Sequence, residues 1–319
     1  MAGETVRGVP GGVPTRATFE SVIKLRLKSL WDRSVAFWKV FSRSRLGMIG
    51  FIMLLVFVAM ALTGPVLTAT GLLQNPEQQN LDNQYEGPTS RFWFGTDQLG
   101  RDLFSRIWWG SQATLLIGFA ASAISMGLGT VIGLISGYYG RWLDEILMRI
   151  VDFFLVLPTL VLILILAAVL PPPGANLWKV IFVIGISLWA STARLVRAQV
   201  LSLKERQFVE RARAVGTGNV RIVFRHIFPN AFTLVFAEAI LTVAVAILSE
   251  SFLSFINIGP ADVVTWGKIL EGALDAKAID TGLVFWVVVP GLYIVAVVMA
   301  FTLLGFALDE IVNPRLRRR

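Results

Sequence analysis

Long apolar segments recur along this 319-residue chain, and they restrict the folds open to it more than any other feature. Each of six segments has roughly the 20 residues that a helix needs to cross the hydrocarbon core of a bilayer. Because lipid offers no hydrogen-bonding partners, a crossing segment must satisfy its own backbone groups, which favours helices. Only 16% of the residues are charged, against about 25% in soluble domains. We therefore expect an all-α polytopic membrane protein with six transmembrane helices, at about 46–67, 113–137, 146–170, 180–196, 231–256 and 283–308.

The distribution of cations predicts how these segments are oriented. Six spans place both termini on one side of the membrane, together with the loops 138–145 and 197–230. All but six of the 29 Lys and Arg residues lie on that side or at span ends that face it. Cytoplasmic loops carry the excess of Lys and Arg, so both termini are expected in the cytoplasm. This asymmetry accounts for the net charge of +8, and no nucleic-acid partner is expected.

The spans divide the chain into a tail, a membrane domain and a second tail. Residues 1–45 form a cytoplasmic tail, in which 19–41 have the pattern of a basic amphipathic helix that lies on the inner membrane surface or packs against the bundle. Residues 46–308 form the membrane domain in the lipid bilayer, and 309–319 form a basic cytoplasmic tail. Between the spans we expect an external segment at 68–112, a cytoplasmic loop at 197–230 and a second external segment at 257–282.

The residues that most enzymes use are scarce in this chain. It contains no cysteine and one histidine, His226, which falls in the cytoplasmic loop. A phosphate-binding loop of the form G-x-x-x-x-G-K-[ST] does not occur in the sequence. We therefore expect no catalytic site, no bound metal and no cofactor in this chain.

The loop 197–230 is long, basic and polar between two apolar segments, and it contains two candidate helices. Residues 207–214 are expected to be helical and to end at Gly216 in the left-handed conformation. Residues 220–228 form a second predicted helix, and Pro229 is expected to begin the fifth span. Glu210 and the arginines around it lie beside a small apolar surface. That surface either enters a groove of another protein or belongs to an ordinary amphipathic loop helix.

A second motif lies in the external segment, where residues 94–102 read FGTDQLGRD. Thr96 or Asp97 can cap a helix that runs over about 99–109. Arg101 and Asp102 can then hold this helix against the bundle or a partner. A folded external cap is favoured over direct contact with substrate. The motif residues that carry this interpretation are Gly95, Thr96, Asp97, Gly100, Arg101 and Asp102.

Charges inside the spans are costly and often functional. Arg149 and Asp152 lie three residues apart, which allows a pair on one helix face, either structural or part of a gate. Glu238 and Glu250 lie in the fifth span, and Glu250 either lines a path or packs against a hydroxyl or cation of a partner. Gly129, Gly133 and Gly137 place small residues on one face of the second span, where another helix can approach closely. The residues that could line a path or form a gate are Arg149, Asp152, Glu238, Glu250 and Trp266.

Two motifs resemble those of one family. Glu210, Ala212, Gly216 and Pro229 have the spacing of the EAA loop of ABC importer permeases, with Ile227 near the usual isoleucine position. Residues 94–102, followed by Ser105 and Arg106, resemble the signature before the second span in C-type subunits of dipeptide/oligopeptide permeases. The EAA loop departs from the family pattern in that Arg211 replaces an alanine and His226 stands at the isoleucine position.

The resemblance implies a type I ABC importer permease fold in a prokaryotic plasma membrane. It implies that loop 197–230 carries a coupling helix, that the fifth span lines the pathway, and that 257–282 forms a re-entrant outer gate. The implied partners are a homologous B-type permease, two ABC ATPase subunits that bind ATP and Mg²⁺, and an external substrate-binding protein. The cargo expected from the resemblance is dipeptides or oligopeptides.

Other interpretations stay open at this point. The same machinery could carry oligosaccharides or, less in keeping with one histidine and no thiol, nickel or glutathione. An ion-coupled secondary transporter would show inverted repeats and broken helices with carboxylates at the midplane. A membrane-embedded enzyme would need a catalytic constellation that this sequence lacks.

Overall fold

The fold was analysed in a computed structural model that describes residues 31–32, 35, 38–171 and 176–312. The chain divides into two units, residues 1–43 and 44–319. In the first unit, 31–32, 35 and 38–41 are helical, and the rest of the predicted amphipathic helix lies outside the described residues. Residues 313–319 of the predicted basic tail also lie outside them. All helices named below belong to the second unit.

The second unit is helical, as expected. Apart from one isolated bridge between Thr96 and Asp102, no β-structure occurs in the described ranges. Within the residues that the structure describes, five helices are long and apolar enough to cross a membrane, and the bent pair α4–α5 makes a sixth span if it is counted as one. A 3₁₀ turn occupies Leu81–Asn83, and a π-helical turn at Val223–Ile227 joins α8 to α9. The helices are α2 (Arg45–Ala69), α3 (Leu103–Tyr139), α4 (Arg141–Val156), α5 (Thr159–Val169), α6 (Leu177–Lys204), α7 (Gln207–Ala214), α8 (Asn219–Ile222), α9 (Phe228–Phe255), α10 (Trp266–Asp275) and α11 (Val284–Val312).

The third predicted span differs most from expectation, because it is two helices bent by 96° and not one. Its helical run stops at Leu157, which is extended, with ψ at 132°. Proline disfavours the α conformation in the residue before it and offers no N–H to continue the helix. Pro158 therefore ends α4, and α5 starts in a new direction directly after it. An apolar window detects the length of such a segment but not this break.

The closest helix pair is α3 with α6, and three glycines of α3 make the contact possible. A Cβ atom at Gly129 would lie 2.6 Å from the carbonyl oxygen of Trp189, and one at Gly133 would lie 2.6 Å from that of Ala193. At Gly137 the nearest atom would be Cβ of Val200, at 2.8 Å. These glycines therefore serve packing inside the subunit, since any side chain would push the two helices apart.

A second core forms where α10 lies against α3, α9 and α11. Trp266, the first residue of α10, is fully buried and donates a hydrogen bond from Nε1 to the carbonyl oxygen of Ile107 at 2.8 Å. Its ring has edge contacts with Phe57 and Tyr293, at centroid distances of 5.6 and 5.7 Å. A Cβ atom at Gly267 would lie 2.7 Å from Cβ of Ser254, so α10 sits tightly on the end of α9.

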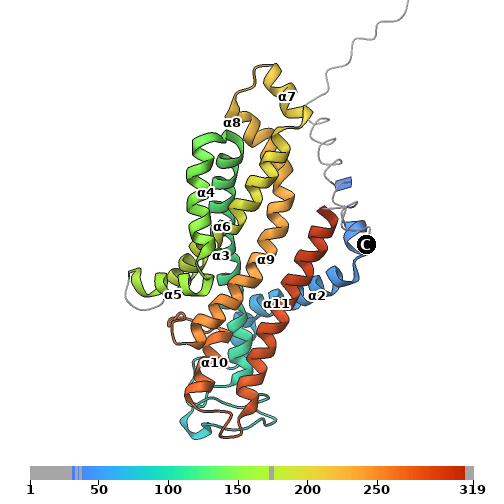
Figure 1. Cartoon of the computed structure of the whole chain (residues 1–319). Helices are drawn as coiled ribbons and strands as arrows, with labels where there is room; N and C mark the ends of the chain where they lie inside the picture. The colour runs from blue at the N-terminus through green and yellow to red at the C-terminus, as the bar shows by residue number, and fades with distance from the viewer. Residues whose placement is uncertain (1–30, 33–34, 36–37, 172–175, 313–319) are drawn as a thin grey trace, which may run out of the picture. The chain divides into compact units, whose positions relative to one another are not determined.

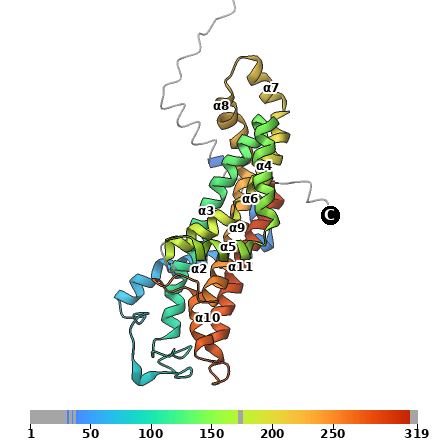
Figure 2. The ribbon, with the colours of Figure 1, turned by 60° about the vertical axis from the view of Figure 1, so that its left-hand side comes forward.

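Figures 1 and 2 both place the loop that carries α7 and α8 at one end of this unit and α10 at the other. Helix α9 runs from the first end toward the second (Figure 1). The two sequence motifs are therefore well separated, and one continuous helix extends between them.

Candidate functional site

The loop between α6 and α9 contains α7, whose bounds agree with the helix predicted at 207–214. Val209 and Ala212 are its buried residues, and they belong to an apolar cluster with side chains of α3, α6 and α9. Glu210 is exposed, and so are the apolar side chains of Phe208 (38%) and Val215 (81%). Val215 therefore does not lie on the buried face. The helix is anchored on one side and presents apolar and charged groups on the other.

Gly216 ends α7 as predicted, with φ at +76°. The N–H of Thr217 donates to the carbonyl of Ala212 at 3.0 Å, and the N–H of Gly216 donates to that of Arg213 at 2.9 Å. These two bonds form the Schellman motif, which satisfies carbonyl groups that the helix end leaves open. The left-handed conformation is strained for residues with a Cβ atom, so glycine is the residue that suits this turn.

The second predicted helix of the loop is not separate from the fifth span. Helix α8, the π turn and α9 follow one another without a gap over Asn219–Phe255, so Pro229 lies inside a continuous helix. In the π turn the N–H of Phe228 donates to the carbonyl of Val223, five residues back. Proline clashes with the carbonyl four residues before it in a regular α-helix, and a widened turn avoids that clash. The side-chain amide of Asn230 donates to the carbonyl of His226 at 2.6 Å.

Ile227 is fully buried in the same apolar cluster as Val209 and Ala212. It therefore holds the loop in place and offers no surface to a partner. Exposed apolar surface comes instead from Val220 and Phe224, which are 64% and 63% exposed. Neither residue belongs to the motif that the sequence offered, although both lie in the second predicted helix of that loop.

Polar contacts that the sequence did not reveal fasten this loop to α3 and α4. Tyr138 donates from its hydroxyl to Oδ1 of Asn219 at 2.8 Å. Lys204 donates to the carbonyl of Gly137 at 3.2 Å. Arg197 donates from Nε and Nη2 to the two carboxylate oxygens of Asp144, both at 2.6 Å. These groups come from α3, α4, α6 and α8, so hydrogen bonds tie the loop to the membrane helices.

The predicted motif at 94–102 forms a tight loop and not the start of a helix. Asp102 is the N-cap of α3, accepting from the N–H groups of Phe104 and Ser105 at 3.3 and 2.9 Å. The prediction that Thr96 or Asp97 caps a helix from about residue 99 is therefore wrong. The Thr96 hydroxyl donates to the carbonyl of Asn83 at 2.5 Å and accepts from the N–H of Glu86 at 2.9 Å. Because Thr96 is bonded within the loop, Asp102 is the residue that caps α3.

Asp97 organises the rest of the motif. Its carboxylate accepts from the N–H groups of Leu99 and Arg101, at 2.9 and 3.0 Å, and from Nε of Arg101 at 2.7 Å. Gly95 and Gly100 have φ values of +80° and +68°. A Cβ atom at Gly100 would lie 1.7 Å from the carbonyl oxygen of Asn80, and one at Gly95 would lie 2.4 Å from that of Glu86. The loop is folded on its own backbone, in agreement with a structural cap.

Comparison with known proteins supports the family resemblance. The family model described as "binding-protein-dependent transport system inner membrane component" matches residues 129–318. A second model, the N-terminal transmembrane domain of oligopeptide transport permease C, matches residues 29–88. The chain belongs to the family of binding-protein-dependent transport inner membrane components. The C-type assignment within the dipeptide/oligopeptide ABC permeases is confirmed.

Individual relatives cover most of the chain. The dipeptide transport system permease protein DppC of Alkalihalophilus pseudofirmus is 34% identical over 88% of this chain and 89% of its own length. The oligopeptide transport system permease protein OppC of Bacillus subtilis is 34% identical over 90% of this chain and 92% of its own. A structure of the MetNI methionine ABC transporter in inward-facing conformations covers 66% of this chain and 95% of its own, with 20% identity and a TM-score of 0.49.

The charged pair predicted inside the third span does not form. Asp152 pairs with Arg194 of α6, with Nη2 and Oδ1 2.5 Å apart, and both side chains are about half exposed. The expected pair with Arg149 is wrong, because α6 supplies the partner and Arg149 faces outward on α4. Glu238 is half-buried in α9.

Glu250 and Trp266, the two remaining candidates for the permease pathway, lie in the interior of the subunit. Both side chains are fully buried. Ser254, one turn further along α9, donates to Oε1 of Glu250 at 2.7 Å. Of the alternatives for Glu250, packing against a hydroxyl therefore describes it, although the hydroxyl belongs to its own chain. Trp266 is a core residue of the segment 257–282. Neither faces an open surface of this chain.

Proposed function

We propose that this chain is the non-catalytic C-type transmembrane subunit of an ATP-driven importer of dipeptides and oligopeptides. It pairs with a homologous B-type permease in a prokaryotic plasma membrane, with both termini in the cytoplasm. Two ABC ATPase subunits bind ATP and Mg²⁺ and contact the α7 loop, and a substrate-binding protein delivers peptides at the α10 end. The similar proteins are dipeptide and oligopeptide permeases, which supports this cargo over oligosaccharides.

The observation that carries this proposal is the two-sided character of α7. Its inner face is locked into the subunit by Val209 and Ala212, while Phe208, Glu210 and Val215 remain exposed. An amphipathic helix of this kind fits a groove in a partner through its apolar groups, and its charges give the docking its specificity. A cytoplasmic position for this end agrees with its cations, which include Lys204, Arg206, Arg211, Arg213, Arg221 and Arg225.

Transmission of movement follows from the contacts of the loop. When the ATPase subunits close, α7 moves with them, and α6 and α9 move because they share its apolar cluster. Helix α9 then carries the movement to α10, since Gly267 sits directly against Ser251 and Ser254. The segment 257–282 is thereby displaced at the end where peptides arrive. The pathway then opens alternately to the two sides of the membrane.

The test replaces Gly216 with proline in the complete transporter. Proline cannot adopt the φ of +76° found there, and it removes the N–H that donates to Arg213. The expected result is ATP hydrolysis that continues while peptide uptake falls at least tenfold, in a complex that still assembles. The matched control is Gly218→Pro, because Gly218 is also exposed but has a φ of −66°, which proline adopts readily.

Charge reversal at Glu210 provides a second test. Glu210→Lys places a cation among Arg206, Arg211 and Arg213 on the docking face, so we expect weaker binding of the ATPase subunits and loss of uptake. Glu205→Lys is the control, since Glu205 is exposed but lies outside α7. Peptide uptake at the normal rate by both Gly216→Pro and Glu210→Lys would refute the proposed role of the loop.

A further inference from the structure

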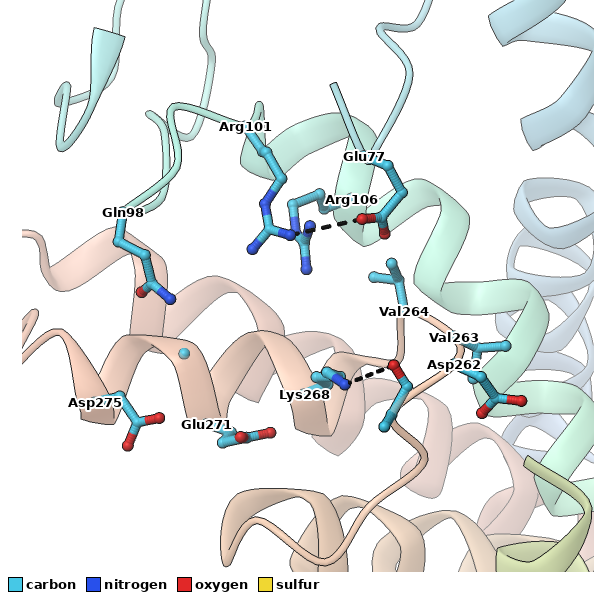
Figure 3. Close-up of a pocket in the computed structure, with 12 residues that line it drawn as sticks. Glu77, Gln98, Arg101, Arg106, Asp262, Val263, Val264, Lys268, Glu271 and Asp275 are labelled. Carbon is cyan, nitrogen blue, oxygen red and sulfur yellow. Dashed lines mark hydrogen bonds and ion pairs between the residues drawn. The ribbon is translucent and has the colours of Figure 1, made fainter. Parts of the chain in front are cut away.

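The end of the permease opposite α7 contains a cleft to which the coupling mechanism assigns no role. It lies between the loop of the FGTDQLGRD motif and α10, with a volume of about 310 Å³ (Figure 3). A second cavity of about 360 Å³ adjoins it and shares Glu77, Asp262, Val263 and Val264 with it. Each has a volume near the lower limit of about 300 Å³ for small-molecule sites.

One wall of the cleft carries two arginines that are held rigidly. Nε of Arg101 lies 2.7 Å from Oδ2 of Asp97, and Nε of Arg106 lies 3.7 Å from the same oxygen. Arg106 is buried and also donates to the carbonyl of Pro76 at 3.1 Å. Two guanidinium groups thus share one buried carboxylate. Nη1 of Arg101 also lies 3.7 Å from Oε2 of Glu77, whose side chain is 62% exposed.

The opposite wall is acidic and unpaired. Glu271 and Asp275 lie one turn apart on α10, and within the described part of the chain neither has a cation within 4.0 Å. Lys268, the nearest lysine on that helix, donates instead to the carbonyls of Pro260 and Ala261. Burial raises the pKa of Glu271, an effect that Lys268 opposes and Asp275 strengthens. A cation entering the cleft would therefore stabilise the ionised carboxylate.

Between the walls, the cleft offers a neutral amide and an apolar floor. Gln98 extends from the loop toward α10 (Figure 3), and it is the uncharged polar side chain that lines the cleft. The adjoining cavity is lined by Trp109, Ala113, Val263 and Val264, which provide apolar contact area.

We propose that this cleft binds a short peptide by its two charged ends, an inference that rests on the proposed function. The terminal carboxylate faces Arg101 and Arg106, and the terminal ammonium faces Glu271 and Asp275. The side-chain amide of Gln98 lies beside the peptide backbone, and an apolar side chain enters the cavity beside Trp109. Arginines on one wall and carboxylates without a cation partner on the other match a zwitterion better than a ligand of one charge.

The experiment measures binding of the dipeptide Ala-Phe by saturation-transfer NMR. The protein is the transporter complex containing the full chain in nanodiscs, without ATP and without the external binding protein, which would itself capture the peptide. The test variant carries Glu271→Gln and Asp275→Asn, which remove the acidic wall and leave the arginine contacts intact. The control variant is Asp280→Asn, an exposed carboxylate of the same segment outside both cavities.

We expect roughly tenfold weaker Ala-Phe binding by the double variant and unchanged binding by the control, as loss of a charge-assisted contact implies. N-acetylated Ala-Phe lacks the ammonium group, so it should bind the unaltered complex more weakly than Ala-Phe does. It should bind the double variant and the unaltered complex equally. Equal binding of Ala-Phe by unaltered and double-variant complexes would overturn the inference. A second outcome would also overturn it. If O-phosphoethanolamine binds the unaltered complex but not the double variant, and Ala-Phe does not bind, the cleft is a site for a lipid headgroup.

Uptake by the complete transporter separates this inference from the proposed function. Suppose that the transporter takes up Ala-Phe in an ATP-dependent manner, but that the double variant binds Ala-Phe as well as the unaltered complex does. That result would refute the cleft assignment and leave the proposed function standing. Absence of peptide uptake by the unaltered transporter, with another solute transported instead, would refute the proposed function. In that case, Ala-Phe binding that depends on Glu271 and Asp275 would still support the cleft as a zwitterion site.

Discussion

At the scale of single residues, the chain depends on glycines where the backbone folds against itself. Gly95 and Gly100 combine a positive φ with a neighbouring carbonyl that leaves no room for a Cβ atom. Gly216 has a positive φ but open space around it. A side chain at Gly95 or Gly100 is therefore excluded by steric contact and by backbone strain together. At Gly216 a side chain is disfavoured by the backbone conformation alone.

This difference predicts a large effect at Gly100. A Cβ atom there would lie 1.7 Å from the carbonyl oxygen of Asn80, so Gly100→Ala must displace the motif loop. We expect destabilisation of about 2–4 kcal/mol, from the left-handed strain and the overpacking combined. Thermal unfolding of the complex in detergent measures the change.

Gly87 provides the matched control for that measurement. It lies in the same loop region, has no positive φ, and has no atom within 4 Å of an added Cβ. Gly87→Ala should therefore unfold at nearly the temperature of the unaltered protein. Equal unfolding temperatures for the two variants would show that the loop is not packed as described.

At the scale of elements, sequence patterns located the helices better than their ends and breaks. Helix α7 could be predicted to the residue, because its polar flanks and Gly216 mark it locally. The start of α3 could not, since Thr96, Asp97 and Asp102 are all suitable caps and only their loop partners decide among them. Long-range partners also explain the missed pairing of Asp152, whose cation comes from a different helix.

The break between α4 and α5 gives a prediction at this scale. Proline costs about 3 kcal/mol inside a helix, so Pro158→Ala removes the main obstacle to one continuous helix. We expect the angle between α4 and α5 to open. Spin labels at Ile146→Cys and Ile165→Cys, both more than half exposed, report the change as a longer distance.

A straight helix would separate those two positions by about 28 Å at 1.5 Å per residue. Because the native chain has no cysteine, the two labels attach only where they are introduced. An unchanged distance in Pro158→Ala would mean that the packing of α5 on α6 sets the 96° bend and that the proline merely tolerates it.

At the scale of the whole molecule, the permease domain has two chemically different ends connected by α9 (Figure 1). The α7 end presents an amphipathic helix with exposed apolar and charged groups, and the α10 end presents the charged cleft. Apolar segments and cation counts predicted this division from the sequence. The burial of Glu250 and Trp266 did not follow from the sequence, because a charge or ring in a span is compatible with a pathway as well as with a core.

The central claim is that the α7 end is held by an ATPase in the cytoplasm, and a single cysteine at Val215 tests it most directly. Val215 is 81% exposed beside Gly216, and the chain contributes no other thiol. Val215→Cys should crosslink to an ATPase subunit in the assembled complex, while Ile279→Cys, exposed at the opposite end, should not. Labelling of Val215→Cys by an impermeant reagent from outside intact cells, with no crosslink to the ATPase, would contradict the account.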